Sequence, residues 1–152
     1  MNFIIQRSEM PFDQHACPLV VIRCIDFRFR DADQRYVTES LGVANFDMIG
    51  LPAPAKQFLQ DSSTREYLAN VIETVCIGKH RVSSVLILGH WDCGGYGGSK
   101  AFASAEAEEI QYIADLRSAR SYLIERFQTH KISIAYSRMD SDKLTYHRID
   151  EK

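Results

Sequence analysis

The stretch V-L-I-L-G-H-W-D-C-G-G-Y-G-G, residues 85–98, decides how the rest of this chain is interpreted. It opens with four apolar residues, passes through a glycine to His90 and Cys93, and ends with four glycines around one tyrosine. The apolar run predicts a buried strand, and open α/β sheets bind ligands at the carboxyl ends of such strands. The H-x-x-C spacing therefore places two metal-binding side chains at a strand end, which is half of a zinc site.

A second apolar run, L-V-V-I-R-C over residues 19–24, predicts another strand that is covered on both faces. It leads into a C-x-D-x-R motif whose first residue is Cys24. Parallel neighbouring strands bring their carboxyl ends together, so Cys24 can converge with His90 and Cys93. Two thiolates and one imidazole leave one tetrahedral position free, as catalytic zinc requires. The predicted cofactor is Zn²⁺, with a bound water whose pKa falls to about 7.

The remaining chain alternates predicted helices and strands. The expected helices are residues 33–41, a segment from the capping box Ser63-Thr64-Arg65-Glu66 to Gly78, and residues 105–129; the expected further strands are 45–51, 132–136 and 144–146. This order predicts an α/β fold with helices on both faces of a mostly parallel central sheet. About four parallel strands and one antiparallel edge strand are expected.

Two details of this pattern depend on side-chain chemistry. In the helix after the capping box, the apolar stripe is expected on Leu68, Val71, Ile72 and Val75. Two prolines within three residues predict that residues 51–56 form a loop.

The length and composition indicate one globular domain. With 152 residues, 45% of them hydrophobic, the chain can bury a single core. We expect an N-terminal arm over residues 1–17 and a single α/β zinc-binding domain over residues 18–152.

Charge and hydropathy exclude several classes of partner. The net charge of −2 provides no basic excess for nucleic acid, and no apolar run reaches the roughly 20 residues of a membrane span. The N-terminus lacks the basic and apolar regions of a signal peptide, which favours the cytoplasm. In that compartment cysteines stay reduced, so metal binding or catalysis is expected of them rather than disulfides. The chain has four: Cys17, Cys24, Cys76 and Cys93.

Together, C-I-D-F-R and G-H-W-D-C-G-G resemble the β-class carbonic anhydrases, and the resemblance extends over nearly all the chain from residue 18. That family pairs C-x-D-x-R with H-x-x-C-G-G at the ends of two parallel strands. The resemblance implies a zinc enzyme that reversibly hydrates carbon dioxide to bicarbonate. It also implies a homodimer or a higher homo-oligomer, because the family builds its pocket from two subunits.

The resemblance assigns roles to further residues. Asp26 would accept a hydrogen bond from the zinc-bound water or ligate zinc itself, and Arg28 would hold Asp26 in place. Gly94 and Gly95 would let the backbone lie close to the metal loop. Gln14, or His15 beside it, would contact bicarbonate across the dimer.

The sequence departs from the family pattern around the substrate. Phe27 replaces the usual serine between the aspartate and the arginine, and I-G-L-P-A at 49–53 replaces a segment like R-N-A-G-N. Phe46 and Leu51 are expected beside the substrate. The altered segment leaves two alternatives open, namely hydrolysis of carbonyl sulfide or carbon disulfide, and a non-enzymatic zinc-binding protein.

Each site residue also has a simpler structural interpretation. Cys24 alone is a small buried hydrophobe at a strand end, and His90 alone is a core histidine. Asp26 alone is a helix N-cap or a turn residue. The combination of both motifs on two strands favours the metal site over these interpretations.

Overall fold

The computed structural model describes residues 14–149 and contains one five-stranded sheet in the order β2-β1-β3-β4-β5. Its strands are β1 (Leu19–Cys24), β2 (Phe46–Leu51), β3 (Ser84–His90), β4 (Lys131–Asp140) and β5 (Lys143–Arg148). Strands β1 to β4 run parallel, and β5 returns antiparallel to β4 at one edge. The predicted α/β fold, with four parallel strands and one antiparallel edge strand, is confirmed.

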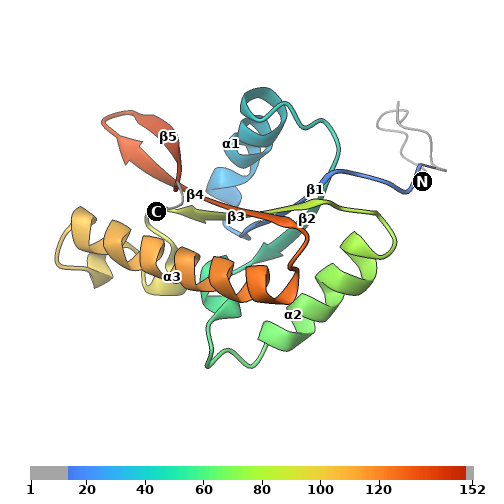
Figure 1. Ribbon diagram of the computed structural model, residues 1–152. Coiled ribbons are helices and arrows are strands. Elements are labelled where there is room, and N and C mark those ends of the chain that lie inside the picture. The colour runs from blue at the N-terminus through green and yellow to red at the C-terminus, as the bar shows by residue number, and fades with distance from the viewer. Residues whose placement is uncertain (1–13, 150–152) are drawn as a thin grey trace, which may run out of the picture.

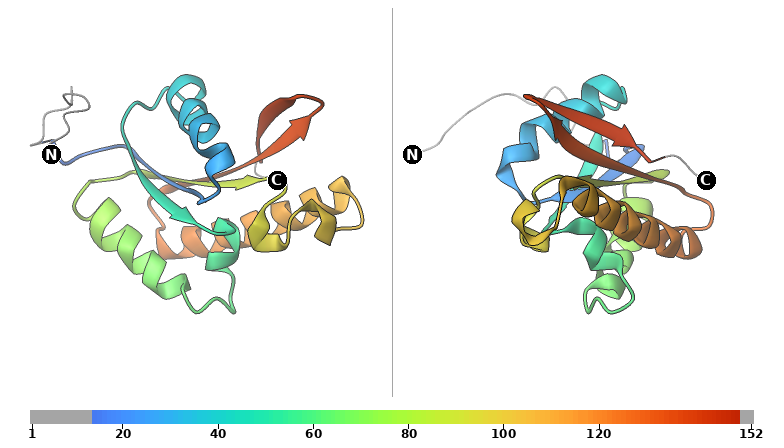
Figure 2. Two further views of the ribbon diagram at one scale, coloured as in Figure 1. Left: turned by 180° about the vertical axis from the view of Figure 1, so that it is seen from behind. Right: turned by 90° about the vertical axis from the view of Figure 1, so that its left-hand side faces the viewer.

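Helices cover both faces of this sheet (Figures 1 and 2). Helix α1 (Arg30–Arg35) lies on one face, whereas α2 (Arg65–Val71) and α3 (Ala105–Arg126) lie on the other. Both α1 and α2 continue into wider π-helical turns, at Tyr36–Ser40 and Ile72–Ile77. Helix α3 begins where the sequence predicts, because Ser104 caps it by accepting a hydrogen bond from Ala107 N at 3.1 Å.

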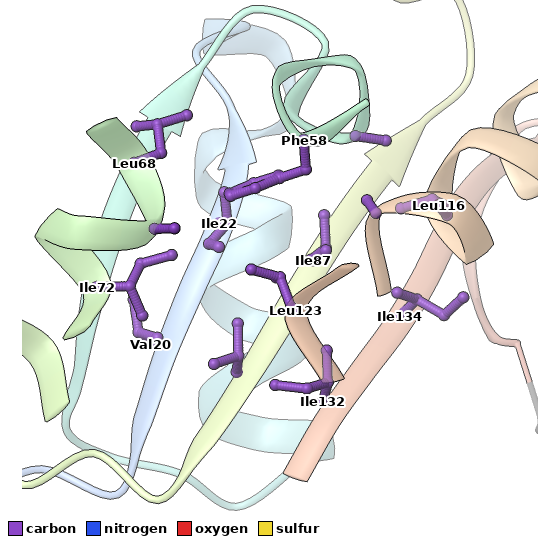
Figure 3. Packing of buried hydrophobic residues seen from close by; sticks show 14 of the residues in the cluster. Val20, Ile22, Phe58, Leu68, Ile72, Ile87, Leu116, Leu123, Ile132 and Ile134 are labelled. Carbon is purple, nitrogen blue, oxygen red and sulfur yellow. The ribbon is translucent and has the colours of Figure 1, made fainter. Parts of the chain in front are cut away.

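The larger part of the core lies between the sheet and the α2–α3 layer (Figure 3). Ile22 of β1 and Ile87 of β3 meet Ile72 from the second helical segment and Leu123 of α3 there, and all four are fully buried. Each such side chain contributes roughly 1.5–3 kcal/mol through burial. This layer holds the carboxyl ends of β1 and β3 in a fixed position.

A smaller core lies on the α1 face. Val21 of β1 and Leu86 of β3 pack there against Val37, and the rings of Tyr36 and Tyr146 stack with centroids 4.3 Å apart. Successive residues of a strand point to opposite faces, so β1 must be apolar on both sides. That is why the sequence of β1 is a continuous apolar run rather than an alternating one.

Three local predictions are wrong. Ser63 does not cap α2: the helix begins at Arg65, and its N-cap residue Thr64 makes no side-chain capping bond. The Thr64 hydroxyl donates to Gln57 Oε1 at 2.8 Å instead. Val75 is 43% exposed, because the buried stripe runs through Leu68, Ile72 and Cys76 at i, i+4 spacing and leaves Val75 outside it.

The segment 51–56 is not purely a loop. A 3-10 turn covers Pro54–Phe58, and Pro54 occupies its first position, where a proline costs nothing because no intrahelical hydrogen bond needs its nitrogen.

The predicted arm at residues 1–17 falls mostly outside the described residues. Of the part that is described, Cys17 N donates a hydrogen bond to His80 O at 3.0 Å just before β1 begins. Within residues 14–149, no helix has the length and apolar character needed to cross a membrane.

Candidate metal centre

Three metal-binding side chains meet at the carboxyl edge of the sheet. Cys24 is the last residue of β1, His90 is the last residue of the adjacent β3, and Cys93 follows in the next turn. Their ligand atoms all lie within 4.8 Å of one another, and the three residues are only 4%, 3% and 2% exposed. The structure therefore brings together the two sequence motifs as the strand order requires.

The His90 ring is oriented for binding through one nitrogen. Its Nδ1 lies 2.7 Å from the carbonyl oxygen of Trp91, so this nitrogen carries the proton and donates it. Its Nε2 is buried and has no hydrogen-bond partner among the described residues. A buried acceptor without a partner is costly, and a metal ion at Nε2 would remove that cost.

The two thiols complete the donor set. Cys24 Sγ and Cys93 Sγ lie 3.8 Å apart, and their hydrogen bond lowers the pKa of the Cys24 thiol while it raises the pKa of the Cys93 thiol. Hydrogen bonds from the backbone of Asp26 and Ala53 lower the pKa of Cys24 further, whereas burial opposes this shift. Two sulfurs and one imidazole nitrogen are a donor set that fits Zn²⁺ and leaves a fourth position for a reactant.

A charged cluster lies beside these ligands. Asp26 accepts hydrogen bonds from Arg28 Nη2 at 2.7 Å and from Arg28 Nε at 3.1 Å, and these bonds lower the pKa of Asp26. Arg28 Nη1 also donates to Asp92 Oδ2 at 2.9 Å. The predicted pairing of Asp26 with Arg28 is present in the structure, and Asp92 is a second carboxylate that the sequence analysis missed.

Helix α3 supports the turn that carries Asp92 and Cys93. The fully buried Glu108 accepts a hydrogen bond from Asp92 N at 2.7 Å through Oε1, and the Tyr112 hydroxyl accepts one from Cys93 N at 3.2 Å. Neither residue can be identified from the sequence alone, because no local pattern distinguishes them from other members of the helix. Only the packing of α3 against the sheet reveals their partners.

The altered segment at 49–53 reaches the metal ligands. Ala53 is 2% exposed and has a left-handed φ of 46°, and a Cβ at position 95 would lie only 2.5 Å from Ala53 Cβ. Gly95 therefore permits a close approach between this segment and the metal loop. A Cβ at Gly94 would meet nothing within 4 Å, so the expected close approach is not required there.

The remaining predicted substrate residues separate into two groups. Leu51 pairs with Cys24 across β2 and β1, so it lies beside the metal centre. Phe46 pairs with Leu19 at the opposite, amino edge of the sheet, where Phe46 and Gln14 line a cavity of about 420 Å³. Within one chain, the structure does not bring Phe46 or Gln14 to the candidate metal centre.

Neither His15 nor the Phe27 ring is buried with the metal-binding side chains. His15 lines the same cavity as Gln14. Phe27, between Asp26 and Arg28, is 83% exposed. The family's serine position is therefore occupied here by an aromatic ring that faces solvent.

Sequence comparison assigns this chain to a family. Residues 14–137 match the family described as "Putative carbonic anhydrase", and the chain belongs to that family. This confirms the resemblance to β-class carbonic anhydrases.

One protein sequence and one solved structure illustrate the similarity. An uncharacterized protein of Rickettsia conorii is 30% identical over 120 residues, which are 74% of this chain and 63% of that protein, so the chain spans less than two thirds of this relative. The crystal structure of β-carbonic anhydrase isoform I from Trichomonas vaginalis superposes with a TM-score of 0.54 at 14% identity. That superposition covers 95% of this chain and 87% of the other, and it shows a common fold.

Proposed function

We propose that this chain is a zinc-dependent enzyme that reversibly hydrates carbon dioxide to bicarbonate. One observation carries the proposal: the unpartnered, buried His90 Nε2 lies beside the Cys24 and Cys93 thiols at a sheet edge. Family membership supports the same reaction. Cys24, His90 and Cys93 would hold the ion, and zinc bound there would lower the pKa of a coordinated water to about 7.

Asp26 would orient the attacking water. Arg28 donates to both carboxylate oxygens of Asp26, which lowers the pKa of Asp26 and keeps it ionised at neutral pH. An ionised carboxylate can only accept hydrogen bonds, so it would fix a water molecule through one of that molecule's protons. Asp26 is thus proposed as the catalytic residue and Arg28 as the residue that holds it.

The wall beside the ligands suits an apolar substrate. Leu51, beside Cys24, is partly buried and apolar, and the segment 49–53 contains neither a cation nor a side-chain amide. Carbon dioxide loses little in such surroundings, whereas the bicarbonate anion loses hydrogen-bond donors. We therefore expect detectable hydration with weak inhibition by bicarbonate.

Stopped-flow hydration of carbon dioxide by the zinc-loaded protein tests the proposal. Activity that depends on zinc and disappears in His90→Ala is the expected result, with His130→Ala as a control on a histidine outside the cluster. Zinc-loaded protein that hydrates nothing would contradict the proposal and favour a non-enzymatic zinc-binding role.

Hydrolysis of carbonyl sulfide or carbon disulfide is a second candidate, and the apolar segment 49–53 is the observation that favours it. These heterocumulenes are also apolar, linear substrates for the same nucleophile. Measuring sulfide release under the same conditions separates the two functions: the larger kcat/KM identifies the substrate.

The assembly and location belong to the same proposal. We propose a homodimer or higher homo-oligomer in the cytoplasm, in which Gln14 and Phe46 reach the metal centre of a second copy, since neither reaches its own. Sedimentation at micromolar concentration is expected to give at least a dimer. A monomer that retained full hydration activity would contradict this arrangement.

A further inference from the structure

Arg28 lies between two carboxylates from different loops. Asp26, in the turn after β1, accepts from Nη2 at 2.7 Å, and Asp92, in the turn after β3, accepts from Nη1 at 2.9 Å. The backbone oxygen of Asp92 also accepts from Nη2 at 3.0 Å. We call the carboxylates of Asp26 and Asp92 the Arg28 clamp.

Asp92 is itself held from three sides. Its N–H donates to the fully buried Glu108 at 2.7 Å, and its Oδ1 accepts from Ser99 N at 2.9 Å, which leaves Oδ2 directed to Arg28. Its φ of 55° lies in the left-handed region, which aspartate tolerates better than most residues with a side chain. Asp92 is therefore a fixed point, although its side chain is 31% exposed.

We propose that Asp92 is a positioning residue, which fixes the Arg28 guanidinium and through it the Asp26 carboxylate beside the candidate metal centre. The inference rests on the proposed function, because Asp26 needs a fixed orientation only if it directs a reactant. Nothing in the comparison with relatives assigns a role to this position.

The geometry explains why one carboxylate is insufficient. Asp26 and Arg28 are two residues apart on one loop, and the Arg28 side chain is 43% exposed. The exposed guanidinium can leave a single carboxylate partner for solvent, which breaks its Nε and Nη2 hydrogen bonds to Asp26. The N–H donors of a guanidinium have a rigid, planar fork geometry. A second carboxylate on a separate, anchored loop therefore fixes the plane of the whole group.

The substitution Asp92→Asn tests the proposal with little disturbance of the turn. Asparagine has the same size, accepts the left-handed φ, and keeps an oxygen for Ser99 N. It removes the charge that Arg28 Nη1 contacts. A matched control is Asp31→Asn, which removes the same charge from the exposed Arg30–Asp31 pair, 2.9 Å apart.

Two measurements give the expected result. In zinc-loaded Asp92→Asn, kcat should fall roughly 10-fold with zinc content unchanged, as for other residues that orient a catalytic group. By nuclear magnetic resonance, the Nε–Hε signal of Arg28, assigned by its loss in Arg28→Lys, should exchange faster with solvent in Asp92→Asn. Neither quantity should change in Asp31→Asn.

Other outcomes overturn the proposal. An unchanged Arg28 signal in Asp92→Asn would show that Asp92 does not fix the guanidinium. A fall in kcat that matches a loss of zinc would show that Asp92 only joins the two loops.

The test still gives an answer if the variant does not fold or if the parent protein is inactive. If Asp92→Asn does not fold, Asp92→Gly takes its place, since glycine favours the left-handed φ and keeps the backbone oxygen for Arg28. If the parent protein hydrates no carbon dioxide, the proposed function fails. The Arg28 signal still shows whether Asp92 holds the Arg28 guanidinium in place. Faster exchange in the variant supports it, and equal exchange overturns it.

Discussion

Arg23 and Arg28 both pair with aspartate near the end of β1, yet their surroundings are opposite. Arg23 Nε lies 2.6 Å from Asp33 Oδ2, and the two side chains are 6% and 4% exposed. The Tyr146 hydroxyl also donates to Asp33, at 2.6 Å. Arg28, by contrast, is 43% exposed and pairs with Asp26 beside the candidate metal centre.

The difference separates what builds the fold from what serves the site. The buried pair joins β1 to α1, and through Tyr146 to β5, so its loss leaves a charge inside the protein. The exposed cluster joins two loops whose strands are already paired, so its loss leaves the sheet intact. Buried and exposed pairs of the same chemistry should therefore fail in different ways.

The largest expected effect is at the metal centre itself. His90→Ala should reduce bound zinc from about one ion per chain to nearly none, because two thiols alone form an incomplete site. Metal analysis of the purified protein measures this. Cys76→Ala, at a buried cysteine outside the cluster, should retain its zinc, and full zinc occupancy in His90→Ala would disprove the ligand assignment.

The buried pair should control stability. Asp33→Asn should lower the free energy of unfolding by about 3–5 kcal/mol, since it leaves Arg23 charged and buried without a countercharge, its Nη2 keeping only the hydrogen bond to Asp26 O at 3.0 Å. Urea unfolding measures the change. Asp31→Asn, in an exposed pair two residues earlier, should cost no more than about 1 kcal/mol. Equal losses of unfolding free energy in Asp33→Asn and Asp31→Asn would show that the buried pair contributes no more to stability than the exposed one.

The exposed pair should control activity instead. Arg28→Ala and Asp26→Ala should each lower kcat for hydration roughly 10- to 100-fold, and the double variant should add little because the two residues act together. Zinc content should remain near that of the parent protein. Independent, additive losses would argue against a common role.

The smallest expected effect is the pH dependence of the exposed cluster. Hydrogen bonds from Arg28 lower the pKa of both Asp26 and Asp92 in the folded state. Their stabilisation should therefore be present above the unfolded aspartate pKa of about 3.9, and lost as pH falls through the lower folded-state values.

Comparing the unfolding free energy of the parent protein with that of Arg28→Ala measures the stabilisation by these hydrogen bonds. The difference in unfolding free energy should be at most about 1 kcal/mol at pH 7, as is usual for exposed pairs, and should shrink below pH 4. A difference that grew toward acid pH would contradict the sign of these shifts.

The sequence by itself determined the sheet and the convergence of the ligands. The apolar runs at 19–24 and 85–88 predict β1 and β3, and the structure extends the second run to His90. These features depend on local periodicity, which a single sequence displays. Because parallel strands have their carboxyl ends at the same edge of the sheet, the ligands that follow β1 and β3 must lie at that edge.

Only the tertiary structure decided which side chains support the site. The contact between Arg28 and Asp92 requires the left-handed turn at Asp92, and that turn is fixed by Glu108 from α3. The exposure of Val75 likewise appears only once its helix is packed against the sheet. Such contacts join residues that are far apart in sequence and depend on exact loop conformations. Local patterns do not encode them, because the packing of distant elements selects one loop conformation among many with similar local energy.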